Sequence, residues 1–226
     1  MSASPETSSD PPKQRRSRLS AERVLNSSLE LLEEHGFDAF TVAEVSKRAG
    51  ISVGAIYARF GSKESLLRAV HGRAMEVIAL EHAALQAANG PAPRHLPESV
   101  IEAVGMVAGV FSRNRDLLRA FMHLGAVDDV ISRRGSASSR ELARRFKAIV
   151  LVHRDQVGHR DPDTAVDVGF RMAYCTFARQ VMYGPEFESE PPVAWDELVA
   201  EVAAACVAYL LRPAGADVRG RARSSG

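Results

Sequence analysis

Residues 41–63 read TVAEVSKRAGISVGAIYARFGSK, and this stretch decides the fold of the N-terminal part of the chain. Thr41 followed by Glu44 forms a capping box, which predicts that a helix begins at Val42. Gly50 has the backbone freedom that is needed to end this helix eight residues later. The apolar residues between these two signals share one face of the helix, which favours burial of that face: Val42, Val45 and Ala49.

A second short helix is predicted directly after the glycine. Ser52 is a good N-cap, and Ile56 and Phe60 are four residues apart, so both fall on the inner side. Bulky side chains near the start of such a helix would hinder its approach to the DNA major groove. The pair of helices therefore reads as a helix-turn-helix whose outer face carries small residues, a tyrosine and an arginine: Val53, Ala55, Tyr57 and Arg59.

From Ser20 to Leu67 the chain resembles the DNA-binding domain of the TetR (tetracycline repressor) family of bacterial transcription regulators. This resemblance implies an all-α fold, with an N-terminal three-helix helix-turn-helix domain followed by a C-terminal helical domain for ligand binding and dimerisation. The order and spacing of five short motifs carry the resemblance: EEHGF at 33–37, FTV at 40–42, AGIS at 49–52, IYARF at 56–60 and GSKESL at 61–66.

Composition and helical periodicity divide the chain into four parts. Residues 1–18 hold nothing apolar to bury and are predicted to be a disordered basic tail, and residues 213–226 a second disordered tail. Residues 19–65 are expected to form the DNA-binding domain and residues 66–212 the regulatory and dimerisation domain. Besides the helix-turn-helix, helices are expected after Ser20 and at about 62–88, 98–111, 116–127, 138–153, 163–183 and 193–211, with a break at 133–136.

The whole-chain composition indicates a protein of the cytoplasm. With 226 residues, 46% of them hydrophobic, the chain can bury a sizeable core. It has no run of 18 apolar residues and no secretory leader, so we expect it neither to span a membrane nor to be secreted. Cys175 and Cys206 lie within apolar helical patterns and are both expected to be buried.

Positive charge is concentrated where a polyanion is expected to bind. Residues 13–73 contain 11 Lys or Arg against 7 Asp or Glu, whereas residues 74–226 contain 18 against 19. Lys13, Arg15, Arg16 and Arg18 form a basic cluster just before the DNA-binding domain. This cluster is either a solvated terminus or an arm that contacts DNA.

The resemblance also implies which residues contact DNA. Phosphate contacts are expected from Thr41, Tyr57 and Lys63, and groove contacts from Ser52, Val53, Ala55 and Arg59. Many relatives have a polar residue where this chain has Val53, and an aromatic residue where it has Arg59. The base preference therefore cannot be copied from any relative.

The last two expected helices are apolar on more than one side, so each must be covered twice. In the TetR family the second cover is another subunit, joined through a four-helix bundle. A single-chain core that buries both sides is the alternative. The residues expected at the dimer interface are Phe170, Phe177, Val181, Val199, Val202, Cys206 and Tyr209.

The resemblance implies a homodimeric repressor that binds a palindromic double-stranded DNA operator and is released by a small-molecule effector. Neither a metal nor another cofactor is expected. An activator, or a regulator with a protein partner in place of a small ligand, is the alternative.

A helical-bundle enzyme is disfavoured because no Ser-His-Asp, Cys-His or Glu-x-x-His pattern is present. Polar candidates for the effector pocket are His82, His123, Arg171, Tyr174 and Arg179.

Overall fold

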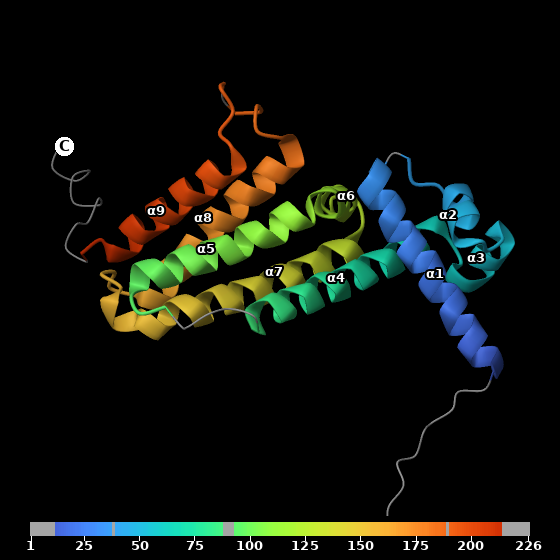
Figure 1. Cartoon of the computed structure of the whole chain (residues 1–226), viewed down its shortest axis with the longest axis horizontal. Helices are drawn as coiled ribbons and strands as arrows, with labels where there is room; N and C mark the ends of the chain where they lie inside the picture. The colour runs from blue at the N-terminus through green and yellow to red at the C-terminus, as the bar shows by residue number, and fades with distance from the viewer. Residues whose placement is uncertain (1–11, 38, 88–92, 189, 214–226) are drawn as a thin grey trace, which may run out of the picture. The chain divides into compact units, whose positions relative to one another are not determined.

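The computed structural model describes residues 12–37, 39–87, 93–188 and 190–213, and in these ranges all regular structure is helical. The all-α fold predicted from the sequence is confirmed. Within the described part of the chain, no helix is long and apolar enough to cross a membrane. In chain order (Figure 1) the elements are α1 Pro12–His35, α2 Val42–Ala49, α3 Val53–Phe60, α4 Lys63–Ala87, α5 Leu96–Arg113, α6 Arg115–Gly125, α7 Asp129–Val150, a 3₁₀ helix η1 Leu151–Gln156, α8 Pro162–Tyr183 and α9 Trp195–Leu211.

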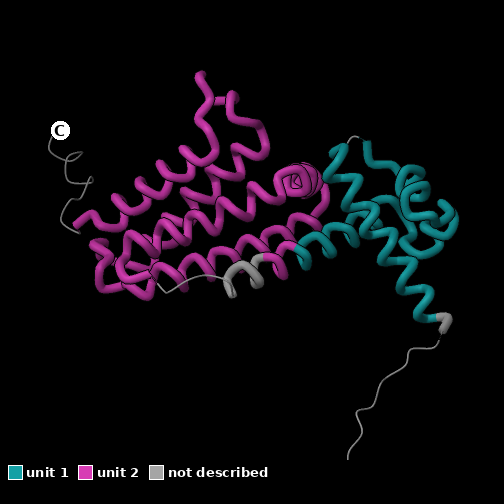
Figure 2. Tube along the Cα trace, viewed as in Figure 1, with its two compact units in different colours: residues 1–77 teal, residues 78–226 magenta. Residues whose placement is uncertain are grey.

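The helices form two compact units, residues 1–77 and residues 78–226 (Figure 2). The division falls inside α4, so this helix belongs to both units. In the first unit α1 packs against α2, and α2 packs against α3. Its small core consists of side chains with almost no exposed area, among them Val24, Leu32, Phe40, Val45, Ile56, Leu66 and Val70.

The start of α1 corrects the prediction of a disordered segment up to residue 18 and of a helix cap at Ser20. The helix begins at Pro12, and Ser20 lies inside it. Proline is tolerated at the first helical position, and the Lys, Gln and Arg residues that follow are good helix formers. The later turns of α1 are anchored by burial of Val24 and Leu32, so the polar first turns extend an existing helix instead of nucleating one.

The second unit is built around α5, which packs against α7, α8 and α9. Figure 1 shows α5 running alongside these helices, as the contacts require. Val100, Val104 and Val107 of α5 have no exposed area, and Phe146 of α7 meets Phe170 of α8 edge-to-face at 5.7 Å between ring centroids. This apolar core is contiguous, so the unit has its own source of hydrophobic stability.

The predicted break at 133–136 is absent from the structure, because α7 runs without interruption from Asp129 to Val150. Asp128 caps its start by accepting hydrogen bonds from the backbone N–H groups of Val130 and Ile131, at 2.9 and 3.0 Å. Ile131 is buried and anchors the first turn. A glycine within a helix costs about 1 kcal/mol relative to alanine, and the cap and the buried anchor outweigh this cost at Gly135.

The two cysteines differ, which corrects the prediction that both are buried. Cys206 of α9 is fully buried, and its thiol donates to the backbone carbonyl of Gly169 at 3.6 Å. Burial raises the pKa of the Cys206 thiol to about 11. Cys175 is exposed, because α8 turns Ala173 and Phe177 toward the core and leaves the residue between them outside.

The segment after η1 closes against the end of α9. The Gly158 N–H donates to the Leu210 carbonyl at 2.8 Å and so satisfies one of the carbonyls that a helix C-terminus leaves unpaired. A β-carbon at position 158 would lie 2.7 Å from the Arg212 carbonyl oxygen and 2.8 Å from that of Leu211. These obstacles are backbone atoms, so this close approach requires glycine.

Gly158→Ala is expected to destabilise the second unit by about 1–3 kcal/mol, because the added methyl group forces η1 and the end of α9 apart. This corresponds to a Tm lower by about 3–10 °C. Fluorescence of Trp195, the single tryptophan, reports the transition because its ring lies 5.4 Å from that of Phe177. The matched control is Gly105→Ala in α5, where a β-carbon meets no atom within 4 Å. A Tm lowered equally in both variants would contradict the steric explanation.

Candidate DNA-binding site

Two hydroxyl caps begin α2 and α3, as the sequence predicted. The Thr41 Oγ1 accepts a hydrogen bond from the Glu44 N–H at 3.1 Å, and the Ser52 Oγ accepts one from the Ala55 N–H at 3.2 Å. In each case the hydroxyl oxygen is used as an acceptor. The hydroxyl hydrogens of these exposed residues remain available as donors, which is the role that a phosphate contact requires.

The turn between α2 and α3 depends on the backbone of Gly50, which adopts the left-handed conformation with φ 65° and ψ 34°. Only glycine adopts this conformation without steric cost. The N–H groups of Gly50 and Ile51 both donate to the Ser46 carbonyl, which closes the end of α2. The chain then re-enters a helix in a direction that buries Ile56, which is 2% exposed.

Burial of Ile56 leaves the predicted groove-contacting residues of α3 on the surface. Val53 and Tyr57 are 38% and 44% exposed, and Ala55 and Arg59 are also exposed. Together with the capping residues Thr41 and Ser52, they form one exposed surface. The first turn of α3 exposes no large side chain on this surface. This geometry suits insertion of the helix into a major groove.

Lys63, the remaining residue expected to contact phosphate, packs within the domain. Its ammonium group lies over the rings of Phe37 and Phe40, at 5.6 and 5.8 Å from their centroids. Such cation–π contacts hold the charge close to the aromatic faces. The Lys63 charge is thus fixed at the start of α4 instead of extending freely into solvent.

One contact of Arg59 was not predicted from the sequence. Its guanidinium Nη1 donates to the Ser17 hydroxyl at 2.6 Å, across 42 residues of sequence. Ser17 lies in the first turns of α1, which the sequence analysis assigned to a disordered tail. No local pattern signals this contact, because it exists only if α1 extends back to residue 12.

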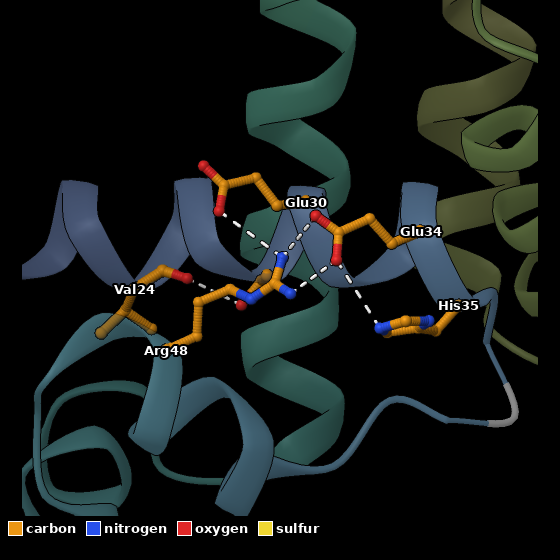
Figure 3. A network of polar contacts seen from close by, with 6 residues as sticks. Val24, Glu30, Glu34, His35 and Arg48 are labelled. Carbon is orange, nitrogen blue, oxygen red and sulfur yellow. Dashed lines mark hydrogen bonds and ion pairs between the residues drawn. The ribbon is translucent and has the colours of Figure 1, made fainter.

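An ion-pair network joins the end of α1 to the end of α2 (Figure 3). Arg48 forms a two-pronged pair with Glu34, with Nη1 2.8 Å from Oε1 and Nη2 2.5 Å from Oε2, and Glu30 lies 3.7 Å away. His35 approaches Glu34 from the other side at 3.6 Å. The sequence analysis missed this network, although two glutamates spaced four apart on α1 were a signal for a basic partner.

The Arg48 hydrogen bonds lower the pKa of the Glu34 carboxyl from its ordinary value of 4.5 and raise the pKa of the guanidinium. A carboxylate whose pKa is lowered by folding stabilises the fold above its unfolded pKa. That contribution is lost as pH falls through the lowered value. Because the groups are exposed, the free energy involved is small, and the main effect is to fix the angle between α1 and α2.

Arg48→Gln is therefore expected to increase amide hydrogen exchange in α2 at neutral pH, measured by mass spectrometry on the full chain. The difference from the unmodified protein should vanish well below pH 4.5, where Glu34 becomes protonated. The control is Arg73→Gln, which breaks a pair with Glu76 inside one helix and links no two elements. A difference between Arg48→Gln and the unmodified chain that persisted unchanged in acid would contradict the ion-pair account.

Four of the seven residues expected at a dimer interface are buried in the core of the single chain: Phe170, Phe177, Val181 and Cys206. The pattern thus predicted burial correctly, but the cover comes from the same chain, because α8 packs against α5, α7 and α9. Val199, Val202 and Tyr209 pack against the same core and keep part of their surface exposed.

The four effector-pocket candidates whose side chains the structure describes have different surroundings. His123 is exposed, Arg171 pairs with Asp167 at 2.8 Å, and Arg179 pairs with Glu188 at 2.5 Å. Tyr174 alone joins the core, with its ring 5.2 Å from that of Phe111. The side chain of His82 lies outside the described part of the structure.

Comparison with known proteins addresses the first unit most directly. Residues 24–70 match the family model described as bacterial regulatory proteins, tetR family. A curated relative, the uncharacterised HTH-type transcriptional regulator YerO of Bacillus subtilis, is 46% identical over 46 residues. That match spans 20% of this chain and only 16% of the relative. Residues 24–70, which the family model matches, contain α2, the Gly50 turn and α3.

Residues 24–70 are therefore similar to the DNA-binding region of the TetR family.

Solved structures extend the similarity in fold to most of this chain. A transcriptional regulator from Rhodococcus sp. superposes with a TM-score of 0.61 at 14% identity, over 84% of this chain and 95% of that one. A TetR transcription regulator from Haloarcula marismortui gives 0.61 at 15% identity, over 84% and 96%. A TetR/AcrR-family regulator from Thermobifida fusca gives 0.58 at 21% identity, over 83% and 96%. The names of these three solved structures are those of transcriptional regulators.

Proposed function

We propose that the chain is a homodimeric transcriptional repressor that binds a palindromic operator in double-stranded DNA and is released from it by a small molecule. The observation that carries this proposal is the exposed face of α3. The Gly50 turn and the Ser52 cap hold this face, and it bears residues suited to a major groove. Operator binding places the site of action in the bacterial cytoplasm.

In this proposal the contacts with DNA divide into two classes. The hydroxyl groups of Thr41 and Tyr57 donate to phosphates and set the position of the domain without reading sequence. Val53 and Ala55 contact thymine methyl groups, and Arg59 pairs with guanine through two hydrogen bonds. Pairing with a base requires the Arg59 guanidinium to leave Ser17, so base recognition competes with an internal hydrogen bond.

Dimerisation through α8 and α9 is supported by the surface that these helices leave uncovered. On α9 four exposed residues have small side chains, Ala200, Ala204, Ala205 and Ala208, and Glu201 is exposed beside them. On α8, Met172 is 36% exposed and Cys175 is exposed. Small apolar side chains let helices approach closely, which a four-helix interface between two chains requires.

A twofold dimer presents two copies of α3 to one face of the duplex. For helix-turn-helix dimers the half-sites lie about one helical turn apart, roughly 34–36 Å, so the operator is an imperfect palindrome. We further propose that an effector binds the second unit, where Tyr174 borders the core. The effector acts by preferring one of two conformations, and α4, which belongs to both units, transmits the change.

Tyr57→Phe removes one hydroxyl from an exposed position and should weaken DNA binding about 2- to 10-fold on every sequence. Arg59→Ala should instead change which base is preferred at one position of each half-site. Both effects are measurable on duplexes selected by the full chain from a random-sequence library. Arg140→Ala in α7 is the control for loss of an exposed arginine. Unchanged affinity and unchanged base preference in both α3 variants would exclude α3 as the recognition helix.

Ala204→Glu places a charge on the exposed face of α9 without entering the core, and it should convert the dimer to a monomer, measured by light scattering. Ala137→Glu on the exposed side of α7 is the matched control and should leave the dimer intact.

The reactivity of the two cysteines gives a second measurement of the same interface. In the dimer, Cys175 should react slowly with a thiol reagent, and it should react rapidly in the Ala204→Glu monomer. Cys206 should stay unreactive in both forms because it is buried. A folded Ala204→Glu dimer would exclude this interface.

A further inference from the structure

We infer that the first turns of α1 are a second DNA-binding element, in which Arg15 and Arg16 bind the phosphate backbone beside the groove that α3 reads. This inference rests on the proposed function, because it assumes that α3 enters a major groove. It adds a surface outside the helix-turn-helix, and the ligand is the sugar–phosphate backbone of double-stranded DNA.

The charges of Arg15 and Arg16 have no acidic neighbour along the helix. Residues 11–21 hold Lys13, Arg15, Arg16 and Arg18 and no carboxylate. On a helix, side chains three or four residues apart are neighbours. No acidic residue stands at those spacings from Arg15 or Arg16, whereas Glu22 stands four residues after Arg18. Arg15 and Arg16 are both exposed.

The structure makes this segment helical and attaches it to the recognition helix. α1 begins at Pro12, so Arg15 and Arg16 belong to an ordered turn. The next residue, Ser17, accepts the 2.6 Å hydrogen bond from Arg59 of α3. A single serine–arginine contact therefore holds the basic turn within side-chain reach of the outer face of α3.

The dimensions of DNA turn this proximity into a phosphate contact. The major groove is about 12 Å wide and is bordered on both sides by phosphates. A helix that lies beside the recognition helix, and not inside the same groove, faces one of these phosphate rows. Long arginine side chains in such a position form charge-assisted hydrogen bonds to phosphate oxygens.

A purely structural role for the two arginines accounts less well for these observations. Arg48, elsewhere in the same unit, illustrates a structural arginine, because it is held by two glutamates of a neighbouring helix. Arg15 and Arg16 lie instead on exposed turns ahead of the first buried residue of α1, Ala21. Their positive charge raises the local potential at the edge of α3.

The test compares the full chain with the double variant Arg15→Gln/Arg16→Gln. Glutamine is a good helix former, so α1 is retained, and circular dichroism verifies this. Affinity is measured at several salt concentrations on a duplex selected by the unmodified protein and on a scrambled duplex. The control Arg133→Gln/Arg160→Gln removes the same charge from exposed positions of the second unit.

Each phosphate contact that is lost should reduce the slope of log K against log salt concentration by about 0.9. The Arg15/Arg16 variant should therefore lose about 1–2 from the slope on both duplexes and keep the base preference, while the control keeps the full slope. An unchanged slope in a protein that still selects the duplex would overturn this inference alone. Failure of the unmodified protein to select any duplex would overturn the proposed function itself.

Discussion

The structure of the N-terminal unit depends on one backbone constraint, the left-handed conformation of Gly50. This conformation lets the N–H groups of residues 50 and 51 close the end of α2 on the Ser46 carbonyl and start α3 two residues later. The direction that α3 takes then buries Ile56 and exposes Val53, Ala55, Tyr57 and Arg59. A side chain at position 50 would strain the turn and change that direction.

α1 acts as the support for this turn through two polar contacts near its opposite ends. Near its C-terminus, Glu30 and Glu34 hold Arg48 at the end of α2. Near its N-terminus, Ser17 holds Arg59 on α3. Neither contact is buried, so each contributes little to the free energy of folding. Their effect is positional, because together they fix the positions of α2 and α3 against α1.

Local signals made most of the fold predictable. The Thr41 and Ser52 caps, the glycine turn and the apolar periodicity of α5, α8 and α9 all depend on residues a few positions apart. The break predicted around Gly135 has two causes: the local cap at Asp128 was missed, and the burial of Ile131 depends on tertiary packing that a local pattern does not show. Apolar stripes on α8 and α9 predicted burial but not the partner, and Phe177 and Cys206 are covered by their own chain. The two contacts of α1 join residues 14 and 42 apart. The spacing of Glu30 and Glu34 signals a basic partner but does not identify Arg48, and no local pattern signals the contact of Ser17 with Arg59.

Hydroxyl-radical footprinting of the full chain on DNA upstream of its own gene and adjacent genes tests the central claim most directly. The account predicts two protected segments related by a twofold axis, about one helical turn apart, on one face of the duplex. Addition of a releasing molecule would abolish both segments together. Binding without such symmetry, as a single protected segment or as uniform protection that follows only the phosphate backbone, would contradict the claim that paired α3 helices read an operator.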